Sequence, residues 1–85
     1  MYEVGLLING QYGIETVEWP VDLGNKSTAV RTAMKYAKKC PFLDTRGRTI
    51  VAASVTCHSV EDDSEYHIHW VETYRKDGLD YRVDY

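Results

Sequence analysis

The feature that most constrains the fold is one stretch of helical periodicity between segments that alternate with the period of a strand. After Lys26, apolar residues recur at spacings of three and four, the pattern of an amphipathic helix. This stripe consists of Val30, Ala33, Met34, Ala37 and Cys40. The candidate N-caps at the start of the helix are Asn25, Ser27 and Thr28. At its other end, Pro41 cannot continue a helix. The sequence therefore predicts one helix over 27–40, with alanines that allow close approach to a sheet.

Two alternating segments precede this helix. They flank Asn9-Gly10-Gln11-Tyr12-Gly13, a run that favours a hairpin turn because Asn and Gly tolerate positive φ. Placing Val4 opposite Val17, and Tyr2 opposite Trp19, brings the apolar residues to one face. Pro20 has no amide donor, so the second strand is expected at a sheet edge or to end there.

Three further strands are expected after residue 49, joined by turns at 61–64 and 75–78. In the first of these hairpins, Val60 opposite Glu65 would place Cys57 opposite Ile68 and Val55 opposite Trp70. In the second, Tyr74 opposite Leu79 would place Trp70 opposite Val83. Both registers keep the apolar residues on one face.

The predicted fold class is α+β: a single helix packed on one face of a roughly five-stranded, mainly antiparallel sheet, in the order β-β-α-β-β-β. A chain of 85 residues leaves room for one domain, 1–85, and excludes a large multi-step enzyme. A wholly antiparallel sheet and a sheet with a parallel central pair both fit the pattern. The face opposite the helix is expected to be open to solvent or to a partner.

The start of the chain lacks the basic and apolar runs of a signal peptide, and no window reaches the length of a membrane span, so a cytoplasmic protein is expected. Cys40 and Cys57 have neither a metal-binding nor a disulfide-framework spacing. Both thiols are expected to be reduced and mostly buried, in the manner of small hydrophobic residues.

Charge is segregated along the chain. Residues 1–25 hold four acids and no base, 26–48 hold seven bases and one acid, and 49–85 hold eight acids and three bases. The net charge of −3 therefore conceals a basic block on an acidic body, and such an asymmetry steers association. The candidate partner-binding residues are Lys35, Lys38, Lys39, Arg31, Arg46, Arg48 and Tyr36. A secondary acidic surface, able to mimic a phosphate backbone, consists of Glu61, Asp62, Asp63 and Glu65.

Three histidines form the most chemically suggestive set. In the register above, His58 lies opposite His67, with His69 two residues along on the same face. Such a set has the ligand types of a three-histidine zinc site, whereas exposed histidines on a polar sheet face are the plainer interpretation. The set stays a candidate only, and neither a metal nor any other cofactor is predicted.

Catalysis is not predicted. Cys57 and His58 are neighbours on a strand and point to opposite faces, so they cannot form a dyad. The nucleophile-elbow, P-loop and dinucleotide-binding motifs are all missing from the sequence. Of the seven tyrosines, Tyr2, Tyr66, Tyr74 and Tyr81 fit core positions, whereas Tyr12, Tyr36 and Tyr85 are placed to contact a partner.

With its strand start, short Lys-rich helix and tyrosine-rich meander, the chain resembles small phage proteins that act on their hosts. These are anti-CRISPR proteins and, less closely, inhibitors of bacterial RNA polymerase. The likeness is one of size, element order and charge layout. It implies a non-enzymatic inhibitor in the bacterial host cytoplasm that blocks a nucleic-acid-handling complex, with a Cas effector favoured as the partner. It also implies that Lys35, Lys38 and Lys39 face the target or its DNA.

Two alternative functions remain open. The first is a nucleic-acid-binding module that uses the same basic helix, and the second is a metal-binding domain built on the three histidines. A homodimer through the open sheet face is also compatible with the pattern.

Overall fold

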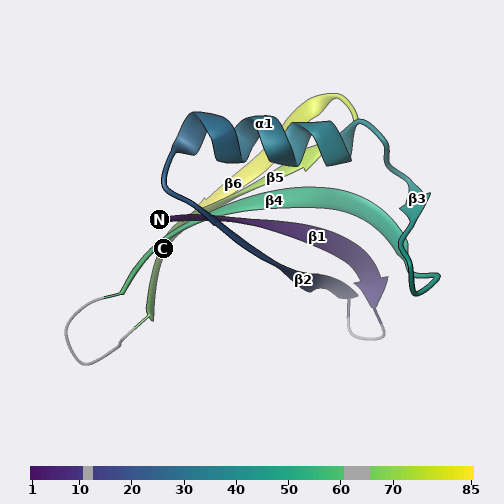
Figure 1. The fold of residues 1–85 in the computed structure, drawn as a ribbon, viewed down its shortest axis with the longest axis horizontal. Helices are drawn as coiled ribbons and strands as arrows, with labels where there is room; N and C mark the ends of the chain where they lie inside the picture. The colour runs from purple at the N-terminus through teal and green to yellow at the C-terminus, as the bar shows by residue number, and fades with distance from the viewer. Residues whose placement is uncertain (11–12, 61–65) are drawn as a thin grey trace.

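A computed structural model describes residues 1–10, 13–60 and 66–85, with the backbone alone described for 14–15 and 17–23. The elements are β1 (Tyr2–Gly10), β2 (Gly13–Leu23), α1 (Lys26–Ala37), β3 (Phe42–Leu43), β4 (Thr49–Val60), β5 (Tyr66–Arg75) and β6 (Gly78–Asp84). The strands form one sheet in the order β2-β1-β4-β5-β6, with the two-residue β3 beside β4, and every pairing is antiparallel. The α1 helix lies over one face of this sheet (Figure 1). The predicted fold class is confirmed, in its wholly antiparallel form, and β2 with Pro20 lies at an edge as expected.

The α1 helix begins one residue before the predicted start at 27 and ends three residues before the predicted end at 40. Asn25 is the N-cap, and its side chain accepts a hydrogen bond from the Thr28 backbone N–H at 3.3 Å. The helix ends at Ala37, so Cys40 lies in the connection to β3 rather than in the last helical turn. Three alanines are fully buried against the sheet: Ala29, Ala33 and Ala37. Because alanine has no side chain beyond Cβ, this stripe lets α1 approach the strands closely.

The core lies between α1 and the sheet. Val4, Val55 and Tyr74 pack with the alanine stripe, and Ile50 packs with Cys40 under the chain that follows the helix. Both cysteines are free thiols, with Cys40 buried and Cys57 half-buried, and burial raises the pKa of the Cys40 thiol.

The registers of the first two hairpins differ from the predicted ones. Val17 lies opposite Leu6 rather than Val4, and Tyr2 lies opposite Leu23 because a bulge falls between Val4 and Leu6. In the hairpin of β4 and β5, Val60 pairs with Tyr66 rather than with Glu65. The difference in the first hairpin is an even number of residues, so each side chain keeps its predicted face. The difference at Val60 is one residue, so the β5 side chains nearest that turn lie on the other face.

A second bulge decides which side chains reach the open face. Cys57 pairs with Trp70 and His58 pairs with Ile68, so one extra residue, His69, separates the two β5 partners. Ile68 therefore shares a face with His58, while Trp70 remains under α1.

A third irregularity lies between β5 and β6. The predicted pair Tyr74–Leu79 is confirmed, but Trp70 lies opposite Asp84 rather than Val83. Tyr74 is buried and Tyr2 half-buried, as expected for core residues, whereas Tyr66 and Tyr81 are exposed, which corrects their predicted core positions.

The sheet arches, with α1 on its convex side and the opposite face concave (Figure 1). A depression of about 380 Å³ on the concave face has side chains from β1, β2, β4, β5 and β6 along its walls. None of the described residues forms a helix that is long and apolar enough to cross a membrane.

Candidate binding surfaces

The outer side of α1 carries an exposed row of cations. Arg31, Lys35 and Lys38 follow one another at spacings of four and three, so they lie along one stripe of the helix. Residues two apart on a helix point roughly 200° apart, which sets this stripe opposite the buried alanines. Within the described residues, no carboxylate forms an ion pair with any of the three. The row is about 10 Å long, from the rise of about 1.5 Å per helical residue.

Helix chemistry contributes to this arrangement. No acidic residue lies in the first turn of α1, and Lys35 lies in its last turn, with Lys38 as the C-cap. Cations near a helix C-terminus are stabilised by the partial negative charge of the free carbonyls. Lys35 and Lys38 therefore also stabilise the C-terminal end of α1.

Two other basic side chains of the helix region lie against aromatic rings. The Lys39 Nζ is 5.6 Å from the centre of the Tyr36 ring, and the Lys26 Nζ is 4.7 Å from that of Trp70. Tyr36 itself is half-buried, with its ring centre 6.4 Å from that of Phe42. Tyr36 is thus part of the packing at the end of α1, while Lys39 remains exposed beside it.

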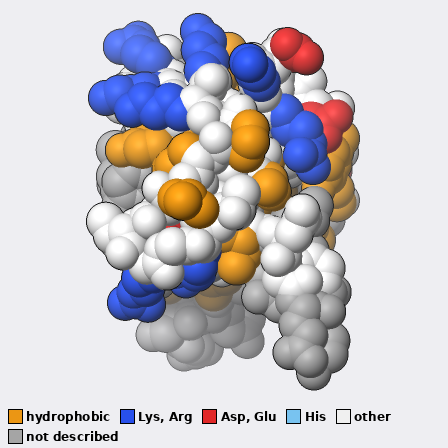
Figure 2. Space-filling model, turned by 90° about the vertical axis from the view of Figure 1, so that its right-hand side faces the viewer, with side chains coloured by type: hydrophobic (Ala, Val, Ile, Leu, Met, Phe, Trp, Pro, Cys, Tyr) orange, Lys and Arg blue, Asp and Glu red, His pale blue; other side chains and the backbone are white. Residues whose placement is uncertain are grey.

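Arg46 and Arg48 belong to a separate turn. The Asp44 carboxylate accepts hydrogen bonds from the backbone N–H of Arg46 and of Arg48, and pairs with the Arg48 Nε at 2.7 Å. Burial of the carboxyl opposes ionisation, but these hydrogen bonds and the guanidinium hold the pKa of Asp44 below its ordinary value. Figure 2 views the molecule from the right-hand side of Figure 1. Most of the basic side chains in this view lie together on the side of α1, and a smaller basic group is separated from them by hydrophobic and neutral side chains. The predicted basic block is thus divided in space.

The histidines do not meet as the predicted register required. His58 pairs with Ile68, and the partner of His67 is Ser59, so His58 and His67 lie on opposite sides of the sheet. The His69 Nε2 lies 2.8 Å from the Ser59 Oγ. In the part of the chain that the structure describes, no three His, Cys, Asp or Glu side chains are placed to hold a metal ion.

His58 instead belongs to a small cluster on the concave face. Its ring is buried and stacks on the Tyr66 ring at 4.7 Å between centres. The Tyr66 hydroxyl donates to Glu3 Oε2 at 3.1 Å, and Glu3 Oε1 lies 3.3 Å from His58 Nε2. This cluster joins β1, β4 and β5 at one end of the concave face.

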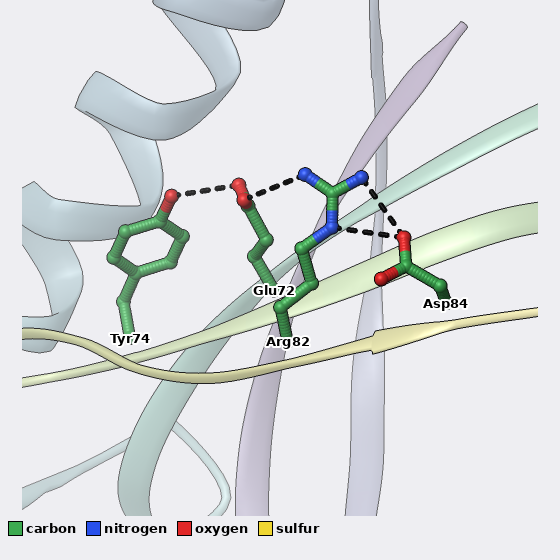
Figure 3. Close-up of polar contacts among 4 residues, drawn as sticks. All are labelled: Glu72, Tyr74, Arg82 and Asp84. Carbon is green, nitrogen blue, oxygen red and sulfur yellow. Dashed lines mark hydrogen bonds and ion pairs between the residues drawn. The ribbon is translucent and has the colours of Figure 1, made fainter.

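Under α1, the sheet holds a buried carboxylate. Glu72 accepts a hydrogen bond from the Tyr74 hydroxyl at 2.9 Å and one from Arg82 Nη1 at 3.3 Å, and Arg82 also pairs with Asp84 (Figure 3). The Arg82 guanidinium lies 4.5 Å from the centre of the Trp70 ring. Burial, together with the hydrogen bond to Glu72, raises the pKa of Tyr74 to about 12.

The candidate acidic surface, Glu61, Asp62, Asp63 and Glu65, lies outside the described residues, as does Tyr12. Tyr85 is well exposed, as expected of a residue placed to contact a partner. The sequence prediction missed Tyr81, Ile68 and Tyr66 as surface residues of the concave face. No sequence signal revealed the bulges that move them there.

No protein-family model, curated protein or solved structure was found to match this chain.

Proposed function

We propose that this chain is a non-enzymatic inhibitor that binds a nucleic-acid-handling complex, with a Cas effector as the favoured target, and blocks the path of its nucleic acid. The observation that carries the proposal is the cationic row of Arg31, Lys35 and Lys38. These side chains are exposed and free of ion pairs within the described residues, on a helix fixed to the sheet by its buried alanines.

Charge layout supports the same function. The row lies on a chain whose two flanking segments are acidic, so the molecule approaches a partner with one preferred orientation. Cations that face solvent without a carboxylate partner can meet phosphates or acidic side chains without first breaking a contact. Lys39 lies at the same end of the helix and adds a fourth cation.

The test is a DNA-binding and cleavage assay of a purified Cas effector, with the chain added in increasing amounts. A stoichiometric inhibitor reaches full inhibition near one chain per complex, and inhibition weakens as salt rises. Replacement of Lys35, Lys38 and Lys39 by Glu is expected to weaken inhibition at least about ten-fold, since like charge at an interface costs several kcal/mol.

The matched control reverses charges elsewhere. Lys26 and Lys76 are exposed cations outside the candidate partner-binding residues, and their replacement by Glu changes net charge in the same direction. The control variant is expected to inhibit almost as well as the wild type. Equal loss in both variants, or turnover of the target by sub-stoichiometric chain, would contradict the proposal. A gel shift of free DNA by the chain alone would favour the nucleic-acid-binding module instead.

A further inference from the structure

The outer edge of β6 carries a self-complementary segment. The segment is Tyr81-Arg82-Val83-Asp84-Tyr85. It has a tyrosine at each end, a valine at the centre, and charges of opposite sign on the two sides of the valine. In an antiparallel pair of two such segments, each basic residue therefore lies opposite an acidic one. β6 is the last strand of the sheet, and no described element pairs with its outer edge. An unpaired edge of this kind is a template for another strand.

Backbone geometry shows which groups this edge offers. The Tyr85 N–H donates to the His69 carbonyl at 3.0 Å, so the polar groups of Tyr85 point toward β5. Because these groups alternate along an antiparallel strand, those of Val83 and Tyr81 also point inward, and those of Arg82 and Asp84 point outward.

We propose that this edge pairs with the same edge of a second copy of the chain, antiparallel and about a two-fold axis at Val83. Arg82 then lies opposite Asp84 of the second copy. Both residues have outward polar groups, so the two equivalent pairs form four backbone hydrogen bonds. Such an interface is isologous and closes as a dimer.

The side chains match in the same register. On the α1 side, Arg82 meets Asp84 of the second copy, and Asp84, whose side chain is 70% exposed, can receive a second cation while it holds its own Arg82. On the concave side, Tyr81 meets Tyr85 of the second copy and Val83 meets itself. Their exposed fractions are 47%, 76% and 40%, so pairing would cover apolar surface now in water.

The other edge of the sheet is less suited to this role. β2 contains Pro20, which has no N–H to donate, and its pairing with β1 is interrupted by a bulge.

Five paired residues on β6 bury less than a standard interface, so we expect a dimer that forms in the micromolar range and dissociates on dilution. This inference is independent of the proposed inhibition and concerns a different surface.

The test is sedimentation over a concentration series, where the mass is expected to rise toward twice the 9.8 kDa of one chain. Asp84→Lys would place cations opposite each other in both pairs and should weaken the dimer at least about ten-fold. The matched control is Asp77→Lys, the same change in the exposed turn before β6, and it should leave association unchanged. Circular dichroism checks that both variants remain folded.

Disulfide cross-linking tests the register proposed for the two β6 strands. At the two-fold axis, the Cα atoms of the two Val83 residues would lie about 4.5 Å apart as a non-hydrogen-bonded pair, within disulfide range. Val83→Cys should therefore form a disulfide-linked dimer under mild oxidation. Leu79→Cys, at a more exposed position before the irregularity in β6, should not.

Three results would overturn the proposal. One is a monomer at every concentration, and another is cross-linking of Val83→Cys no greater than that of Leu79→Cys. The third is a dimer that survives Asp84→Lys but is lost with Ile68→Lys, which would indicate pairing through the concave face.

Discussion

One face of the sheet packs against α1, while the concave face has no described element over it. On the covered face, small residues of the helix meet Val4 and Val55, and every one of these side chains is fully buried. On the concave face, Tyr81 and Ile68 are partly exposed to water. The buried His58 ring on this face stacks against the Tyr66 ring. The same strands thus have one closely packed face and one face that is partly exposed to water.

The largest expected difference in stability comes from the same substitution, isoleucine to alanine, made once on each face of the sheet. Ile50→Ala empties a fully buried site beneath the chain that follows α1 and should destabilise the fold by about 2–5 kcal/mol. Ile68→Ala truncates a side chain that is 38% exposed on the concave face and should cost about 1 kcal/mol or less. Urea unfolding of both variants measures the difference, and equal losses would show that the concave face is covered in solution.

The centre of the concave face is nonetheless tightly packed. A Cβ at Gly5 would lie 2.9 Å from both Ser54 Oγ and Thr16 Cγ2, so Gly5→Ala should cost about 1–3 kcal/mol. Adding Ser54→Ala removes one of the two close atoms and should restore part of the loss. Gly24→Ala, where a Cβ would have nothing within 4 Å, is the control and should unfold close to the wild type. A neutral Gly5→Ala would mean that β1 and β4 are more loosely paired than described.

A tyrosine of the covered face gives a smaller effect that depends on pH. The Tyr74 pKa rises from 10.0 to about 12, chiefly through burial, so the neutral phenol is favoured in the folded state. Its contribution to stability is complete below pH 10 and is lost as the pH rises toward 12. Tyr74→Phe removes the hydrogen bond to Glu72 and should cost about 1–2 kcal/mol at neutral pH.

The diagnostic readout is the slope above pH 10. Wild-type stability should fall more steeply there than that of Tyr74→Phe, measured by denaturant unfolding at pH 9 and pH 11. Parallel slopes would show that the Tyr74 hydroxyl titrates as it does in the unfolded chain.

The sequence patterns predicted the elements better than the registers. Period alone located α1 and its buried Ala33 and Ala37, and the observed cap, Asn25, was one of three candidates, because these features depend on neighbours within one or two turns. Strand pairing depends on contacts between distant segments, and one extra residue reverses every later side chain. The bulge at His69 accordingly separated His58 from His67.

The candidate surface was predictable to the same degree. Exposure of Arg31, Lys35 and Lys38 follows from their place opposite the apolar stripe. The position of Arg48 beside Asp44 depends on a turn whose geometry no periodicity describes. The sequence therefore predicts the charge of one helix face. It does not predict which charged side chains from separate elements lie together.

The smallest expected effect comes from the matching tyrosine of the concave face. Tyr66 donates to Glu3 at 3.1 Å, as Tyr74 does to Glu72, but the Tyr66 side chain is exposed and water can replace its partner. Tyr66→Phe keeps the ring that stacks on His58 and should change stability by less than about 0.5 kcal/mol. Denaturant unfolding of Tyr66→Phe beside Tyr74→Phe makes the comparison, because each variant removes one hydroxyl that donates to one glutamate. A loss at Tyr66 equal to that at Tyr74 would place the Glu3, His58 and Tyr66 cluster in an environment as dry as the space beneath α1, contrary to the division between the two faces.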